Sequence, residues 1–145
     1  MGQEIDLLVN YPKTKRNLEE RVASKTEADR SVARQFGRDF FDGDRRHGYG
    51  GFNYLPRFWQ PVIPTFQDYW KLNEKSAVLD VGCAKGFMLH DLAEMIPGIT
   101  VKGVDISRYA IENAIGSNSS LSCGNPDTTK PGWPSRNWPA DVAGG

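Results

Sequence analysis

In the segment Val78–Phe87, VLDVGCAKGF, an apolar run and an acid are followed by a cluster of small residues. The residues SAVLDV, 76–81, predict a strand that is buried on both faces. FMLHDLAEMI, 87–96, predicts a helix that is stopped by the Pro-Gly pair after it. The side chains expected to turn to one side of this helix are Leu89, Leu92, Ala93 and Ile96.

The pattern continues with ITVKGVD, 99–105, which predicts a second strand, and RYAIENAI, 108–115, which predicts a short helix capped by Ser107. A strand, a turn, a helix and a strand make a βαβ unit, in which the two strands lie parallel and adjacent. The fold class is therefore expected to be α/β, with its compact part at 76–115.

The segment before this unit divides into two parts. Residues 1–44 are charged and are predicted to be helical, because Asn17 and Glu20 fit a capping box. Residues 45–75 are rich in aromatic residues and glycine, and form either a lid over a ligand or a stiff packed connection. The apolar side chains expected on one helical face of the first part, which Asp29 interrupts, are Val22, Val32, Ala33, Phe36 and Phe40.

The segment after the unit has a different composition. Residues 116–145 consist mainly of Gly, Pro, Ser, Asn and Asp, with almost no aliphatic side chains. No helical or strand periodicity is visible there, so this part is expected to be a disordered coil tail.

The spacing of small residues in the turn argues against two phosphate-binding motifs. A nucleotide triphosphatase loop ends in Gly-Lys-Ser/Thr, whereas Lys85 precedes Gly86 here. The dinucleotide fingerprint needs a glycine at the sixth position, which Phe87 occupies. What fits is an acid followed by small residues at alternate positions, namely Asp80, Gly82, Ala84 and Gly86.

This pattern resembles motif I of the class I S-adenosylmethionine-dependent methyltransferases, with Ala84 as its one departure. The resemblance covers about 49–114. It implies an incomplete Rossmann-like methyltransferase fold with parallel strands, and S-adenosyl-L-methionine as the cofactor. The residues that it implies as cofactor contacts are Asp80, Gly82, Cys83, Ala84, Gly86, Asp105 and Ile106.

The resemblance also implies separate roles for these contacts. Asp80 would help to hold the cofactor's ammonium group through water, and Asp105 would accept both ribose hydroxyls. Ile106 would pack on the adenine, and Cys83 would be a small residue beside the cofactor. Lys85 is expected to be solvated. The aromatic residues expected to close over the cofactor are Tyr49, Phe52 and Tyr54, with Arg57 meeting its carboxylate.

The implied reaction is methyl transfer to a small-molecule or saccharide acceptor. The family places its acceptor residues after later strands, and 116–145 offers no pattern for them, so no catalytic residue is named. The chain is therefore expected to be the amino-terminal part of a methyltransferase, truncated or frame-shifted, with weak or no activity. The alternatives are a non-catalytic binding fragment and an NAD(P)-binding Rossmann protein.

The charge composition bears on which binding partners the chain is expected to have. Eighteen basic and eighteen acidic side chains give zero formal net charge, so binding to nucleic acid or to a membrane surface is not indicated. No apolar run approaches the roughly 20 residues that span a bilayer.

The two cysteines favour a location in the reducing cytoplasm. His47 and His90 have no clustered partners, so no metal site is expected. The oligomeric state stays open.

Overall fold

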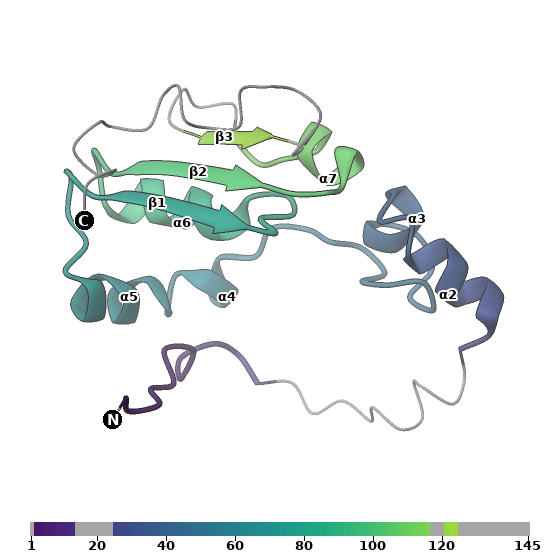
Figure 1. Cartoon of the computed structure of the whole chain (residues 1–145), viewed down its shortest axis with the longest axis horizontal. Coiled ribbons are helices and arrows are strands. Elements are labelled where there is room, and N and C mark those ends of the chain that lie inside the picture. The colour runs from purple at the N-terminus through teal and green to yellow at the C-terminus, as the bar shows by residue number, and fades with distance from the viewer. Residues whose placement is uncertain (1, 14–24, 117–120, 125–145) are drawn as a thin grey trace.

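The computed structural model describes residues 2–13, 25–116 and 121–124. In this part of the chain, a three-stranded sheet has the order β1-β2-β3, with β1 at Ala77–Val81, β2 at Thr100–Val104 and β3 at Leu121–Gly124. Neighbouring strands are parallel. Helix α6, Phe87–Met95, connects β1 to β2 (Figure 1). The predicted βαβ unit and the Rossmann-like α/β class are therefore confirmed for the described residues.

Strand β3 corrects the prediction of coil over 116–145. Leu121–Gly124 pairs in parallel with β2, with Leu121 opposite Val101 and Gly124 opposite Val104. Four residues are too few to show a periodic apolar pattern, and the free edge of β2 supplies the backbone hydrogen bonds that composition cannot reveal. Residues 117–120 and 125–145 lie outside the described part of the chain.

The core lies between the sheet and one layer of helices. Helices α4, Pro56–Trp59, and α5, Ile63–Trp70, lie on the same side of the sheet as α6 (Figure 1). As predicted, α6 turns its apolar side chains inward, and Leu89, Leu92 and Ile96 are buried while Ala93 packs against them. The other buried members of this core are Val62, Ile63, Phe66, Cys83, Ile99 and Val101.

The first strand is not buried on both faces, contrary to the prediction. Val81 is 72% exposed and Leu79 is 37% exposed. In the described sheet β1 is an edge strand, and the described helices α4, α5 and α6 lie on the other side of the sheet (Figure 1). An apolar run fits a strand with two covered faces, but it does not show whether the cover is present.

In the described part of the N-terminal segment, residues 2–13 and 25–44, two short helices are found where a single one was predicted. Helix α2 covers Glu27–Ala33 and α3 covers Arg38–Phe41. Phe36 adopts a left-handed φ of 48° between them, which ends the helical path. Asp29 interrupts the apolar face because it completes a capping box with Thr26. The capping box predicted at Asn17 and Glu20 lies outside the described residues.

Helices α2 and α3 lie beyond the end of the sheet toward which β1 and β2 point (Figure 1). Helix α7, Arg108–Glu112, lies beside α3. Its N-cap is Ser107, as predicted, whose hydroxyl accepts a hydrogen bond from the Ala110 amide at 3.0 Å. The Ser107 hydroxyl also donates to the carbonyl of Phe36, which ties α7 to the N-terminal segment.

Candidate cofactor site

The turn after β1 has an unusual backbone. Gly82 and Gly86 have φ values of 90° and 74°, and Ala84 has a φ of 49°. A left-handed conformation costs a non-glycine residue about 1–2 kcal/mol, so neighbouring contacts have to hold Ala84 in place. The amides of Gly82 and Cys83 both donate to the carbonyl of Val104, at 2.7 and 3.1 Å, which fixes the turn against the end of β2.

The carboxylate of Asp105 points at this turn. One oxygen, Oδ2, accepts a hydrogen bond from the Ala84 amide at 2.7 Å, and the other, Oδ1, accepts one from the Ser107 amide at 2.7 Å. These two bonds fix the side chain between the turn and the start of α7. Each carboxylate oxygen can accept a second hydrogen bond, so capacity for ligand hydroxyl groups is left.

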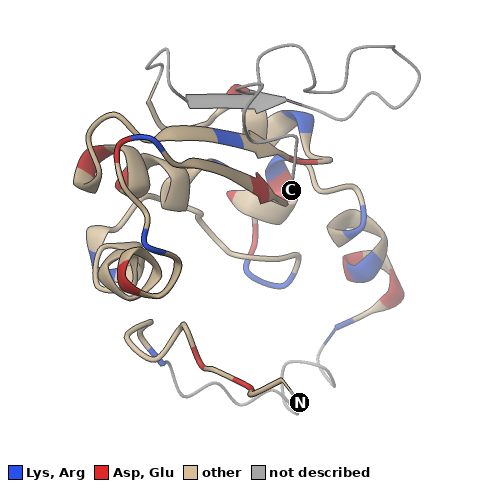
Figure 2. Ribbon diagram, turned by 60° about the vertical axis from the view of Figure 1, so that its left-hand side comes forward, with Lys and Arg blue, Asp and Glu red and all other residues tan. Residues whose placement is uncertain are grey.

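A second carboxylate, that of Asp80, lies close to the first. Burial and the negative charge of Asp105 raise the pKa of Asp80 above its ordinary value. No described residue donates a hydrogen bond to this side chain. Figure 2 shows acidic positions at the carboxyl ends of both β1 and β2. This arrangement favours a ligand that brings positive charge and hydrogen-bond donors.

Beside the two acids, the turn has an open side. Ile106 is 70% exposed, and Val81 is likewise exposed. A Cβ atom built on Gly82 would meet nothing within 4 Å. An apolar ring could therefore lie on Ile106 while the backbone of Gly82 is approached closely.

Cys83 belongs to the inner side of the turn. Its side chain is 6% exposed and is part of the core cluster. A Cβ atom on Gly103 would lie 2.6 Å from the Cys83 sulfur and 2.6 Å from Leu89 Cδ1. The side chain of Cys83 therefore packs on β2, and its expected place beside the cofactor stays a prediction.

Lys85 is buried, contrary to the prediction that it is solvated. Only 7% of the residue is exposed. Its ammonium donates to Asp42 Oδ2 at 2.7 Å, to Asp42 Oδ1 at 3.0 Å and to the carbonyl of Phe52 at 2.9 Å. The Tyr109 hydroxyl also donates to Asp42 Oδ2, at 2.6 Å. No sequence pattern marks this contact, because Asp42 and Lys85 lie 43 positions apart.

The Asp42 carboxylate is well satisfied. The amide of Phe52 donates to its Oδ1 at 2.9 Å. Burial alone would raise the pKa of Asp42, but the hydrogen bonds from Lys85, Tyr109 and Phe52 prevail and lower it to about 2. Asp42 is therefore ionised at neutral pH and forms a stable ion pair with Lys85.

The aromatic segment packs against the residue that follows the turn. The rings of Phe52 and Phe87 stack with centroids 4.8 Å apart, and Tyr49 contacts Phe52 at 4.3 Å. The Tyr54 hydroxyl donates to buried Asp91 at 2.5 Å, and burial together with that bond raises the pKa of Tyr54 to about 12. Of the two alternatives, a packed connection describes these contacts, and the predicted closure over a cofactor stays a prediction.

Arg57 contacts its neighbour in the sequence, Phe58. Its guanidinium lies over the ring of Phe58, 5.0 Å from the centroid. The expected contact with a cofactor carboxylate therefore stays a prediction, without a structural contact to support it.

Within the described residues, no group of three or more His, Cys, Asp or Glu side chains could hold a metal ion. His47 pairs with Asp29 at 3.3 Å, and the ring of His90 contacts Tyr54 edge-on at 5.1 Å. None of the helices in the described ranges is long and apolar enough to cross a membrane. The cytoplasmic location stays a prediction.

Comparison with known proteins supports the class of this fold and turn. Residues 72–125 match the family described as "Methyltransferase domain". The match includes β1, the turn, α6, β2 and Asp105, so the resemblance to the N-terminal part of a class I methyltransferase is confirmed over this stretch.

The chain is also similar to the solved structure titled "Crystal structure of MccD protein". The identity is 24% and the TM-score is 0.44, with 56% of this chain and 37% of that chain covered. The chain thus spans just over a third of the length of that protein. A comparison with curated proteins gave no match.

Proposed function

We propose that this chain binds S-adenosyl-L-methionine at the turn 82–86 and serves methyl transfer to a small-molecule or saccharide acceptor. The observation that carries the proposal is the Asp105 carboxylate, which is fixed at the end of β2 and directed at the turn through the Ala84 amide. A carboxylate at this place suits a pair of ribose hydroxyls.

The rest of the site fits the remaining parts of this cofactor. Asp80, whose pKa is raised by burial and by Asp105, gains an opposite charge when an ammonium group or a sulfonium lies nearby. The exposed side chain of Ile106 offers an apolar surface for an adenine ring. The positive φ of Gly82 and the open space around it allow the ligand to approach the backbone.

S-adenosylmethionine, when bound, supplies an electrophilic methyl group. Asp105, Asp80 and the backbone of the turn 82–86 would hold and orient the cofactor. Alignment of this kind accounts for a large part of the rate gain in displacement reactions. The acceptor class is the one that the resemblance to the methyltransferases implies, and it is part of the proposal.

An NAD(P) cofactor is the weaker candidate. Asp105 would suit its ribose equally well. The dinucleotide fingerprint, however, needs a glycine at the position of Phe87, where a helix packs closely on a strand. Phe87 instead carries a ring that stacks on Phe52.

Titration calorimetry of the full chain with S-adenosylmethionine tests the proposal. The wild-type chain and the control Asp68→Ala, changed at an exposed position on α5, should release similar heat, and Asp105→Ala should bind at least about tenfold more weakly. Binding of NADH, detected by its fluorescence, with no heat from S-adenosylmethionine would favour the nicotinamide alternative. No binding of either ligand would leave a non-catalytic fragment.

A further inference from the structure

The buried lysine of the turn has a structural setting that cofactor binding alone does not explain. Lys85 lies between Ala84 and Gly86, which both have positive φ. The ammonium of its side chain donates to Asp42, the residue that follows α3. A buried lysine needs a partner of opposite charge, because an unpaired buried charge strongly destabilises the fold.

Asp42 connects four parts of the molecule that are distant in sequence. It follows α3, and it binds the ammonium of Lys85 in the turn, the Tyr109 hydroxyl on α7 and the Phe52 amide in the aromatic segment. A second bond, from the Ser107 hydroxyl to the carbonyl of Phe36, lies on the same side. The segment 36–52 is thereby fastened to the turn and to α7.

The turn is consequently held from two sides. Asp105 holds the amide of Ala84, and Asp42 holds the side chain of Lys85. A loop with left-handed residues keeps its shape only when its surroundings determine it. A turn that is already in its binding conformation loses less conformational entropy when a ligand binds.

We propose that Lys85, Asp42 and Tyr109 form a latch that fixes the segment 36–52 against the turn, and that these three residues are positioning residues for cofactor binding. The inference rests on the proposed function, since the ligand in question is S-adenosylmethionine. It adds that affinity depends on Asp42, which lies before β1 and outside the matched stretch 72–125.

The experiment combines two measurements on the full chain. Calorimetry with S-adenosylmethionine gives the affinity, and amide hydrogen exchange of the ligand-free chain gives the local stability of the turn. The variants are Lys85→Met, Asp42→Asn and Tyr109→Phe. The last removes one hydroxyl only, so it is informative where a charge-removing variant fails to fold.

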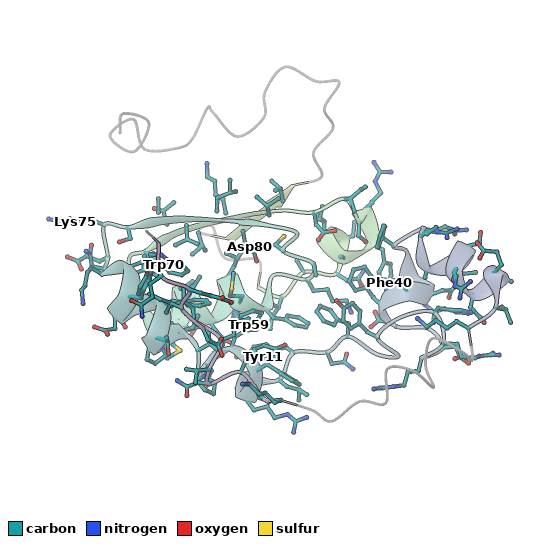
Figure 3. All side chains as sticks on the ribbon, turned by 60° about the horizontal axis from the view of Figure 1, so that its bottom comes forward. Tyr11, Phe40, Trp59, Trp70, Lys75 and Asp80 are labelled. Carbon is teal, nitrogen blue, oxygen red and sulfur yellow. The ribbon has the colours of Figure 1, made fainter. Side chains whose placement is uncertain are left out.

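The matched controls are Lys75→Met and Tyr69→Phe. Both residues are exposed, and Lys75 lies at the opposite end of the sheet from Phe40 of α3 (Figure 3). All affinities are measured well below the unfolding midpoint of each variant, so that a general loss of stability does not lower the bound fraction.

Lys85→Met and Asp42→Asn should weaken cofactor binding about tenfold, and Tyr109→Phe about threefold. Exchange at the amides of Ala84 and Gly86 should become about tenfold faster, while that of Val101 in the core changes less than about twofold. A purely structural role would move all three amides together.

The outcomes separate the two proposals. Unchanged affinity and unchanged turn exchange in Lys85→Met, with a wild-type chain that binds S-adenosylmethionine, overturn the latch and leave the proposed function standing. A wild-type chain that binds no S-adenosylmethionine overturns the proposed function, and with it the role of the latch in binding.

Discussion

Gly103 shows how one missing side chain allows the turn to lie on the sheet. It is opposite Asp80 in the register of β1 and β2, and any Cβ there would lie 2.6 Å from both the Cys83 sulfur and Leu89 Cδ1. Such distances are far below van der Waals contact, so the turn and α6 would have to shift together.

We expect Gly103→Ala to lower the free energy of unfolding by about 1–3 kcal/mol, because overpacking a core forces backbone shifts. Urea unfolding measures the change. Gly37→Ala is the control, since a Cβ there meets nothing within 4 Å. Equal stability of the two variants would show that the contact between the turn and β2 is looser than described.

We expect Asp80 to lower the stability of the ligand-free fold and to strengthen the binding of the cofactor. Burial and Asp105 raise its pKa, so its ionised form destabilises the ligand-free fold at neutral pH. Asp80→Asn should therefore raise the thermal unfolding midpoint at pH 7, and this gain should shrink as the pH falls through the raised pKa. The same variant should weaken S-adenosylmethionine binding by about fivefold.

Scanning calorimetry with and without the cofactor checks both effects of Asp80→Asn. Asp68→Asn, on the exposed surface of α5, serves as the control for removing one negative charge. A lower midpoint together with unchanged affinity would mean that Asp80 is stabilised by contacts of the fold and does not face the ligand.

Among the helices and strands, β1 differs most from its prediction, because its apolar residues predict burial on both faces and one face is exposed. It is an edge strand of the described sheet, and Leu79 and Val81 are exposed on it. Apolar edge strands offer unpaired backbone groups to a second chain and are a common cause of association.

We therefore expect the chain to self-associate with rising concentration, and Leu79→Lys to reduce this association at little cost in stability. Sedimentation velocity over a range of concentrations measures it. Tyr69→Lys, which changes an exposed aromatic residue on α5, is the control and should have a smaller effect. If both variants reduced self-association equally, general surface hydrophobicity would be its cause, and not the edge of β1.

The helices and strands could be predicted where residues close together in the sequence determine them. The positions of β1, α6, β2 and the Ser107 cap follow from apolar runs, the Pro-Gly stop and a hydroxyl before a helix. Phe36 and β3 could not be predicted, because the first takes a conformation that its side chain disfavours and the second depends on a neighbouring strand.

For the molecule as a whole, the ion pair of Asp42 and Lys85 predicts a dependence of stability on pH. The pKa of Asp42 is lowered from 3.8 to about 2, chiefly by Lys85 and Tyr109 acting against burial. A lowered carboxyl pKa stabilises the fold above the unfolded pKa, and this stability is lost as the pH falls from about 3.8 to about 2.

The contribution is about 2 kcal/mol at neutral pH. Urea unfolding at several pH values should show a steeper loss below pH 4 for the wild-type chain than for Asp42→Asn. Asp68→Asn should follow the wild-type curve. Parallel curves for the wild-type chain and Asp42→Asn would contradict the ion pair.

The candidate site could be predicted only in part, because some of its contacts join residues that lie far apart in the sequence. Asp105 was placed at the turn because parallel strands end at the same edge of a sheet, and the structure brings it there. The burial of Lys85 by Asp42, and the inward direction of Cys83, depend on the whole fold. No short pattern marks a contact between residues 43 positions apart.

The central claim is that the turn 82–86 and Asp105 together hold S-adenosylmethionine. The most direct measurement is a titration of the isotopically labelled full chain with this cofactor, followed by the backbone amide resonances. The largest shifts should fall on Gly82, Ala84 and Ile106 and should disappear in Asp105→Ala. Shifts centred elsewhere, or the same shifts in Asp105→Ala, would contradict it.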